Sequence, residues 1–284
     1  MRAPPAIEVT AATFAYDGAP ALIEASVVVP AGGSLALLGT NGSGKSTLLK
    51  GLVGLLDPIA GQVRVLGVPP RQARTRVGYL RQEQWSARVA PMSVRDAVRI
   101  GRFARLGWFR RERAEDRDIV DRAMERFGIG HLANRSLHEL SGGQRQRVQL
   151  AQVLAQQPDV LLLDEPFSGL DLPTQEELLR ILAEERDRGA ALVIATHELG
   201  VARGCDTVLL LRRRVVAAGP PEDVCTESNL VAAFGLMGEA IRGPVPEFVL
   251  DDRHHDRTET RPISPRPTGQ RLADRSRGHT DDVP

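Results

Sequence analysis

The chain has 284 residues, 42% of them hydrophobic and 26% charged, and a formal net charge of +1, a balance that is typical of a globular protein and excludes a general attraction to nucleic acid. Two cysteines, Cys205 and Cys225, exclude a disulfide framework and suit a reducing compartment. We find no secretory signal and no apolar run near the roughly 20 residues that span a bilayer, so we expect a soluble chain that can still have membrane partners.

The N-terminal part predicts antiparallel strands, followed by a strand, a loop and a helix. Apolar and polar residues alternate in "AIEVT" and "SVVVP", and "DGAP" between them is typical of a turn. The run "SLALL" predicts a buried strand, and "KSTLLKGLVGLL" has apolar residues at helical spacing. "DPIAG" then ends that helix, and "QVRVLG" predicts another short strand.

The middle of the chain, from Met92 to about Leu140, is helical in character and rich in arginine, and "SVRD" at 93–96 is typical of a capping box. After it, the helical patterns "GQRQRVQLAQVLA" and "TQEELLRILAEERDRG" alternate with the apolar strands "VLLLD", "ALVIAT" and "TVLLL". Strands that are apolar throughout and alternate with helices predict an α/β fold with a mainly parallel sheet, covered on both faces.

The end of the chain differs in composition. Residues 243–284 are rich in Pro, Arg, Asp, Thr and His, and we predict a disordered tail because they offer little to bury. His254 and His255 in "DDRHHD" raise the question of a metal site, but chance in a flexible tail explains them better, and we assign no site there.

A glycine-rich loop between the predicted strand and helix predicts a nucleoside triphosphate site. Gly39, Gly44, Lys45 and Ser46 satisfy the pattern G-x-x-x-x-G-K-[ST] in the strand–loop–helix context that it requires, which disfavours a plain glycine turn. Backbone N–H groups and the helix N-terminus suit phosphates, Lys45 can reach the β- and γ-phosphates, and Ser46 can ligate Mg²⁺. The predicted loop residues are Gly39, Asn41, Gly42, Ser43, Gly44, Lys45, Ser46 and Thr47.

A pair of carboxylates ends the predicted strand "VLLLD". Asp164 is expected beside the phosphate loop, where it can hold Mg²⁺ directly or through water. Glu165 is expected to point towards the attacking water and to act as its general base. A strand that merely ends in two polar residues is the alternative, and the nearby phosphate loop disfavours it.

Residues 140–171, "LSGGQRQRVQLAQVLAQQPDVLLLDEPFSGLD", resemble the ATP-binding subunits of ABC transporters. In this resemblance "LSGGQ" is the family signature, Tyr16 stacks on adenine, Gln82 is the glutamine-loop residue, Asp171 belongs to the D-loop and His197 is the switch histidine. Alone, Tyr16, Gln82 and His197 each have an ordinary structural explanation; their shared order in the sequence favours the family. The resemblance covers about residues 6–235, with a helical subdomain inserted at about 91–145.

The resemblance implies how such a chain works. ATP and Mg²⁺ are the cofactors, with Ser46, Gln82 and Asp164 around the metal and with Glu165 and His197 catalytic. Ser141, Gly142, Gly143 and Gln144 meet the ATP of a second subunit, so the resemblance implies a head-to-tail dimer of two identical chains. The other implied partners are integral-membrane permease subunits, which place the chain at the cytoplasmic face of the cell membrane, and an extracytoplasmic solute-binding protein; no nucleic acid is implied.

Three classes of function compete for this pattern. "LSGGQ" and the Gln–His pair disfavour a P-loop kinase or GTPase, while the length and the lack of a long coiled coil disfavour a soluble ABC ATPase of DNA repair or the ribosome. The segment 90–118 and "NLVAAFG" are similar to manganese, zinc and iron-type importers, although another substrate or export remains an alternative. The arginines of this segment (Arg102, Arg105, Arg110, Arg111 and Arg113) fit either a solvated face or a patch for anionic headgroups.

Overall fold

The computed structural model describes residues 4–81, 92–106 and 112–235. The predicted tail at 243–284, Gln82, Arg110 and Arg111 lie outside the described residues. Within the described ranges, no helix combines the length and the apolar character that crossing a membrane requires.

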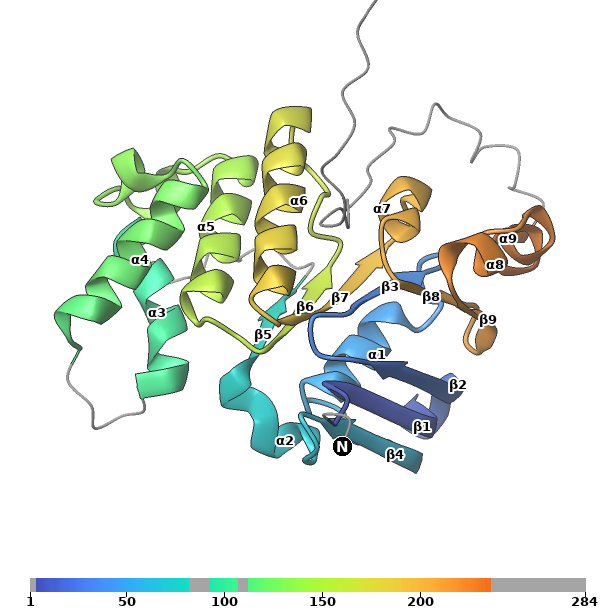
Figure 1. The fold of residues 1–284 in the computed structure, drawn as a ribbon. Coiled ribbons are helices and arrows are strands. Elements are labelled where there is room, and N and C mark those ends of the chain that lie inside the picture. Colours follow the sequence, from blue (N-terminus) through green and yellow to red (C-terminus); the bar gives the residue numbers. More distant parts are fainter. Residues whose placement is uncertain (1–3, 82–91, 107–111, 236–284) are drawn as a thin grey trace, which may run out of the picture. The chain divides into compact units, whose positions relative to one another are not determined.

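An antiparallel sheet is built from the N-terminal residues, as predicted (Figure 1). Its strands are β1 (Ile7–Tyr16), β2 (Ala19–Val29) and β4 (Ala60–Val65), in the order β2-β1-β4. Asp17 and Gly18 join β1 to β2 with φ angles of 47° and 80°. Positive φ at both positions is the geometry of a type I′ turn, which Asp-Gly favours because it matches the twist of the strands.

A second sheet of six strands has the order β5-β6-β7-β3-β8-β9. All neighbouring pairs are parallel except β8 and β9, which confirms the mainly parallel sheet. Its strands are β3 (Ser34–Leu38), β5 (Val77–Leu80), β6 (Val160–Asp164), β7 (Ala191–Thr196), β8 (Thr207–Leu211) and β9 (Val215–Gly219).

The helices alternate with these strands along the chain. They are α1 (Lys45–Leu52), α2 (Pro70–Ala73), α3 (Val94–Leu106), α4 (Ala114–Arg126), α5 (Gly142–Ala155), α6 (Leu172–Asp187), α7 (Leu199–Arg203), α8 (Pro221–Val224) and α9 (Glu227–Phe234). Short 3₁₀ turns lie at Arg74–Arg76, Gly130–Leu132 and Leu137–Glu139.

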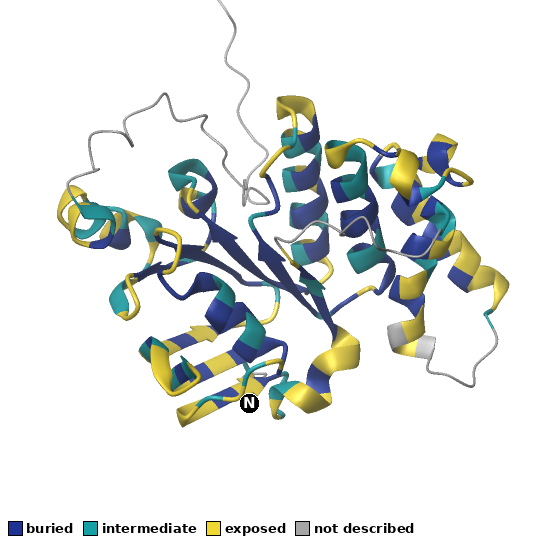
Figure 2. Cartoon of the chain, turned by 180° about the vertical axis from the view of Figure 1, so that it is seen from behind, coloured by how far each residue is buried: buried dark blue, intermediate teal, exposed yellow. Residues whose placement is uncertain are grey.

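Successive residues of the six-stranded sheet face two different cores. Leu35 and Leu37 of β3 belong to a buried cluster with residues of α1 and the antiparallel sheet, whereas Ala36 and Leu38 belong to one with residues of α5, α6 and α7. Every residue of β3, β6 and β7 is buried, and Figure 2 shows these strands as a continuous buried layer. Coverage on both faces explains why the strands lack polar alternation.

Helix α1 ends earlier than its apolar pattern predicts, at Leu52 rather than near Leu56. Gly54 has a φ of 72°, and its N–H donates to the carbonyl of Gly51 at 3.0 Å while that of Leu55 donates to Lys50 at 2.8 Å. These two hydrogen bonds form a Schellman motif, in which a left-handed glycine ends the helix. The prediction was wrong here because periodicity continues past a stop that depends on glycine geometry.

Helices α3 and α4 lie in the segment predicted to be helical from Met92 onwards, and both pack against α5 (Figure 1). Ser93 caps α3 as predicted, since its hydroxyl oxygen accepts a hydrogen bond from the Asp96 N–H at 3.1 Å.

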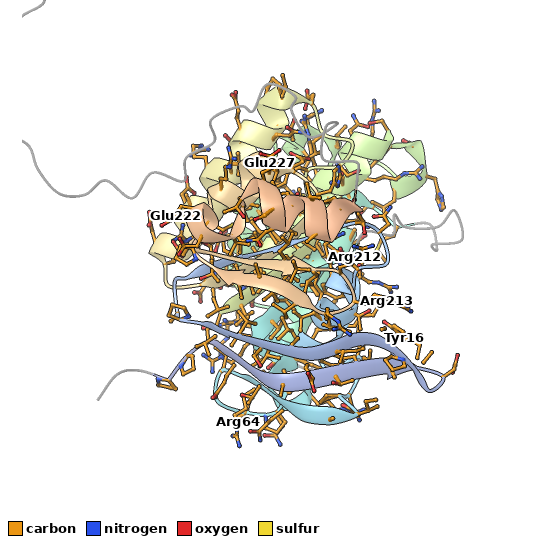
Figure 3. The ribbon with its side chains drawn as sticks, turned by 90° about the vertical axis from the view of Figure 1, so that its right-hand side faces the viewer. Tyr16, Arg64, Arg212, Arg213, Glu222 and Glu227 are labelled. Carbon is orange, nitrogen blue, oxygen red and sulfur yellow. The ribbon has the colours of Figure 1, made fainter. Side chains whose placement is uncertain are left out.

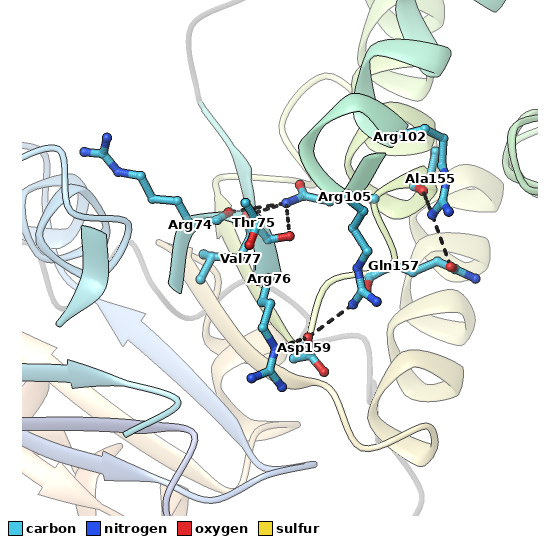
Figure 4. Close-up of polar contacts among 10 residues, drawn as sticks. Arg74, Thr75, Arg76, Val77, Arg102, Arg105, Ala155, Gln157 and Asp159 are labelled. Atoms are coloured by element: carbon cyan, nitrogen blue, oxygen red, sulfur yellow. Dashed lines mark hydrogen bonds and ion pairs between the residues drawn. The ribbon is translucent and has the colours of Figure 1, made fainter. Parts of the chain in front are cut away.

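For Arg102, neither sequence-based explanation, a solvated face or a patch for anionic headgroups, is right. Its side chain is buried and donates at 2.8 Å and 3.2 Å to Oδ1 of Asp116 on α4. It also donates at 3.0 Å to the Ala155 carbonyl and at 3.1 Å to Gln157 (Figure 4). It faces neither solvent nor a membrane surface. Figure 4 also shows that Arg105 shares Asp159 with Arg76 of the 3₁₀ turn before β5. Arginines of α3 therefore tie this helix to the residues between α5 and β6.

Candidate nucleotide-binding site

The loop at residues 39–44 joins β3 to α1 and packs tightly against the end of β8. A Cβ atom on Gly39 would lie 2.4 Å from the Leu211 carbonyl oxygen and 2.6 Å from Ser43 Oγ, so only glycine fits there. Gly44 precedes the helix with a φ of 107°, a conformation that residues with a Cβ rarely adopt. Glycine is thus needed at position 39 because a Cβ atom has no room, and at position 44 because of the positive φ.

Lys45 is the first residue of α1, and its side chain is buried. Nζ donates to the carbonyls of Gly39 at 2.6 Å and Thr40 at 3.1 Å. Burial lowers the pKa of Lys45 below its ordinary value of 10.5, which outweighs the opposite effect of the nearby Glu165 and Asp164 carboxylates. The ammonium group is held inside the loop, where phosphate oxygens can replace the two carbonyls as its acceptors.

A cavity of about 290 Å³ lies over this loop. It is lined by the loop itself, by Tyr16 and Ala21 of the antiparallel sheet, by Glu165 after β6 and by Arg213 after β8. Lys50 Nζ lies 5.4 Å from the centre of the Tyr16 ring, within the range of a cation–π contact. The loop residues that line the cavity are Thr40, Asn41, Gly42, Ser43, Gly44, Lys45, Ser46 and Thr47. Ligands of parallel sheets commonly bind at this position, outside the carboxyl ends of the strands.

Asp164, the last residue of β6, is buried beside the loop. Burial raises the pKa of its carboxyl group; a hydrogen bond from Ser46 opposes this shift, and the charge of Glu165 adds to it. Its Oδ1 atom is buried without a hydrogen-bond partner among the described residues. A buried carboxylate oxygen beside a serine hydroxyl is the oxygen donor set that Mg²⁺ prefers, so Asp164 and Ser46 fit this metal.

Glu165 and His197 come together across the neighbouring strands β6 and β7. Glu165 Oε1 lies 3.7 Å from His197 Nδ1. Glu165 has a left-handed φ of 51°, and its N–H donates at 2.9 Å to the Ala195 carbonyl of β7. This turn of the backbone directs Glu165 to the cavity while Asp164 stays in the strand. Non-glycine residues in this conformation carry strain that commonly marks functional sites.

The predicted signature residues lie elsewhere. Ser141 caps α5, its Oγ accepting from the Gln144 N–H at 3.3 Å while its own N–H donates to the Gln144 side chain at 3.0 Å. Ser141 and Gly142 are exposed, and none of residues 141–144 lines the cavity. The exposed helix N-terminus leaves N–H groups available to an anion from outside this chain.

Asp171 precedes the next helix, α6, at its N-cap position and does not line the cavity. A hydrogen bond from Thr174, and then the charge of Arg147, lower the pKa of its exposed carboxyl group. Arg147 lies on α5 and contacts both Asp171 and Thr174. The structure therefore links α5 to the start of α6. Gln82, the remaining predicted residue, lies outside the described residues.

Arg213 and Ala21 line the cavity but were missed by the sequence analysis. A usable signal existed for Arg213, since three arginines follow the buried strand "TVLLL" directly, and residues after parallel strands gather at the ligand edge. Ala21 has no such signal, because its position in an antiparallel strand resembles any other.

Comparisons with known proteins agree with this geometry. Residues 22–168 match the family described as ABC transporter. The chain is 40% identical to the chelated iron transport system membrane protein YfeB of Yersinia pestis, over 81% of this chain and 79% of that protein. It is 36% identical to the manganese transport system ATP-binding protein MntB of Bacillus subtilis, over 81% and 92% of the two chains. The zinc transport system ATP-binding protein TroB of Treponema pallidum is 39% identical, over 81% and 87%.

Solved structures share the fold. A transporter described as being of the metal-chelate type, in an inward-facing conformation, has a TM-score of 0.69 and 30% identity over 81% of this chain and 88% of that one. The ATP-binding subunit of another ABC transporter has a TM-score of 0.70 and 26% identity, over 84% and 95%. The matched range includes the predicted phosphate loop, the predicted signature residues and the Asp164–Glu165 pair. The chain is an ATP-binding subunit of the ABC transporter family, an ATPase with that family's α/β fold.

Proposed function

We propose that this chain powers the import of a divalent metal ion, such as manganese, zinc or an iron chelate. The observation that carries the ATPase part is one cavity lined by the phosphate loop, Tyr16 and Glu165. The metal part rests on the relatives, whose names specify iron, manganese and zinc transport at 36–40% identity. Residues 6–235 form the ATP-binding domain in this proposal, with the helical subdomain at about 91–145.

ATP would bind with its adenine against Tyr16 and its phosphates on the loop. The N–H groups of the loop and of the α1 N-terminus would hold the β- and γ-phosphates, and Lys45 would add a positive charge. Ser46 and Asp164, with Gln82, would hold Mg²⁺. When bound, this ion neutralises the phosphate oxygens and orients them for in-line attack.

Glu165 would act as the general base of hydrolysis. Its carboxylate takes a proton from water as the water oxygen bonds to the γ-phosphorus, and the bond between that phosphorus and the bridging oxygen breaks to leave ADP and phosphate. His197, 3.7 Å from the carboxylate, would orient Glu165 and donate to a γ-phosphate oxygen. The left-handed backbone of Glu165 supports this role because it brings the side chain to the cavity.

Two copies of the chain would enclose two ATP molecules head to tail. Residues 141–144 would contact the γ-phosphate on the partner subunit, and Asp171 would lie at the same interface. None of these residues lines the cavity of its own chain, which supports this proposal, as does Leu172, which follows Asp171 and is 63% exposed. An exposed leucine at the start of a helix gains from burial in an interface.

Permease subunits would dock on the helical subdomain and bring the chain to the cytoplasmic face of the membrane. Helix α3 supports this with two large apolar side chains on its surface, Ile100 and Phe103, which are 39% and 50% exposed. An extracytoplasmic solute-binding protein would deliver the metal to the same system.

Metal uptake by cells carrying Glu165→Gln in place of the native chain tests this function. We expect uptake of radioactive manganese, zinc or iron to fall to the level of cells that lack the chain. Unchanged uptake of all three metals would contradict the cargo, while ATP hydrolysis by the purified native chain tests the ATPase part separately.

A further inference from the structure

The turn between β8 and β9 holds a residue in an unfavourable backbone conformation. Arg213 has a φ of 60°, which costs a residue with a Cβ about 1 kcal/mol or more and which Gly, Asn or Asp adopts more easily. Of the seven non-glycine residues with positive φ among those described, only Glu165 and Arg213 line the nucleotide cavity. Arg213 thus shares with Glu165 both an unfavourable backbone conformation and a place at the cavity.

The backbone of Arg213 is held from two sides of the cavity. Its N–H donates at 2.8 Å to the carbonyl of Ser43 in the phosphate loop, and its carbonyl accepts at 2.9 Å from the Ile23 N–H of β2. Leu211, two residues earlier at the end of β8, is the residue whose carbonyl oxygen packs on Gly39. Arg213 therefore stands where the antiparallel sheet meets the phosphate loop, and its position relative to the loop is well defined.

Arg213 lines the cavity together with Tyr16. Figure 3 shows the two residues near each other at the same edge of the molecule, whereas Arg212 lies closer to α9. The Arg212 guanidinium donates to the Ala232 carbonyl. For Arg213, no side-chain hydrogen bond or ion pair is formed with any other described residue. A guanidinium without a protein acceptor, beside a phosphate loop, suits a phosphate oxygen.

We infer that Arg213 contacts the phosphates of the bound nucleotide directly, as a second cation beside Lys45 that comes from a different element of the fold. The inference rests on the proposed ATP site and adds a residue to it. Lys45 enters from the helix after β3, and Arg213 from the turn after β8. Two cations on different elements hold a polyphosphate in one orientation, which a single cation does not.

Nucleotide titrations of the full-length protein test this contact. The probes are ATP and ADP, measured by calorimetry at two salt concentrations on the native protein and on Arg213→Ala, Arg213→Met and Arg213→Lys. Arg214→Ala is the matched control, because it removes the same charge from the next residue, which does not line the cavity. Circular dichroism establishes that each variant is folded.

We expect Arg213→Ala and Arg213→Met to weaken both nucleotides about tenfold to a hundredfold and to reduce the salt dependence of binding, since a charge-assisted hydrogen bond is lost. Arg213→Lys should recover part of the affinity, and Arg214→Ala should bind as the native protein does. Native affinity in Arg213→Ala would overturn the inference, as would full recovery by methionine or an equal loss in Arg214→Ala. Nucleotide binding by the native protein, with Arg213→Ala unchanged, would reject this contact and leave the proposed function standing.

Discussion

Gln146 of α5 donates a 2.6 Å hydrogen bond from its buried side-chain amide to the carbonyl of Pro166, the residue after Glu165. The helix that begins with the signature residues is thereby bonded to the segment that holds the proposed general base. Arg147, the next residue, contacts Asp171 and Thr174 at the other end of that segment. The proposed contact of Ser141 with a second ATP would therefore be made by a helix that is bonded to the segment after Glu165.

Gln146→Ala is expected to lower the free energy of unfolding by about 1–2 kcal/mol, because a buried carbonyl loses its donor. It should also lower kcat for ATP hydrolysis more than it weakens ATP binding, since Glu165 loses a support that the phosphate loop does not use. Urea denaturation and steady-state hydrolysis measure the two effects. Gln152→Ala on the same helix is the control, because its side chain bonds no other described residue; a loss of ATP affinity equal to the loss of kcat would count against the positioning role.

Glu165→Gln is expected to reduce ATP hydrolysis by about 10²–10⁴-fold, because an amide cannot accept the proton of the attacking water. Binding of ATP should persist, and the ATP-bound dimer should accumulate in size-exclusion chromatography. Hydrolysis at the native rate would refute the assignment of the base.

Asp164→Asn is expected to raise the stability of the protein without Mg²⁺ and to weaken Mg²⁺-dependent ATP hydrolysis. Burial raises the pKa of Asp164 in the folded protein above its ordinary value of 3.8, so ionisation of this group opposes folding at neutral pH and has no such effect well below pH 3.8. Without nucleotide and Mg²⁺, the variant should therefore unfold at a higher urea concentration than the native protein at pH 7.

The same variant should need at least about tenfold more Mg²⁺ for half-maximal ATP hydrolysis, because a carboxylate ligand is lost. Urea curves with EDTA and a Mg²⁺ titration of hydrolysis measure the two sides. An unchanged Mg²⁺ requirement would remove Asp164 from the metal site.

Arg102→Met is expected to destabilise the protein by about 3–5 kcal/mol, because Asp116 stays buried without its partner. Hydrogen bonds from the Arg113 N–H and from Arg102 hold the pKa of Asp116 below its ordinary value of 3.8. Its contribution to stability is therefore complete above that value and is lost as the pH falls through the lower folded-state pKa.

Denaturation curves across that pH range should show the gap between the native protein and Asp116→Asn closing in acid. The double variant Arg102→Met, Asp116→Leu should recover most of the lost stability. A gap that is constant with pH would contradict the ion-pair explanation.

Phe103→Asp is expected to abolish co-purification with a membrane protein and to leave ATP binding unchanged, because α3 contributes no residue to the cavity. Val231→Asp on α9 is a matched control, since Val231 is 42% exposed and Phe103 50%. Membrane capture that survives the α3 substitution, or is lost equally in the control, would move the docking surface elsewhere.

Local sequence determined much of this protein. The Asp17-Gly18 turn, the buried strands β3, β6 and β7, the glycine loop and the cap at Ser93 all follow from interactions between near neighbours in the chain. The order of the motifs was enough to identify the family, because each motif keeps its place between particular strands.

The tertiary structure alone decided which of these residues meet. Arg102 looked like other surface arginines, and only the approach of α4 and the end of α5 makes it a buried partner of Asp116. Arg213 lines the cavity because β8 pairs with β3, and no local sequence pattern encodes that pairing. The signature residues and the phosphate loop were predicted from the same order of motifs, yet the packing of α5 leaves the signature residues outside the cavity of their own chain. Periodicity and turn chemistry act over a few residues, whereas strand order and helix packing bring distant residues together, and the chemistry of this site depends on both.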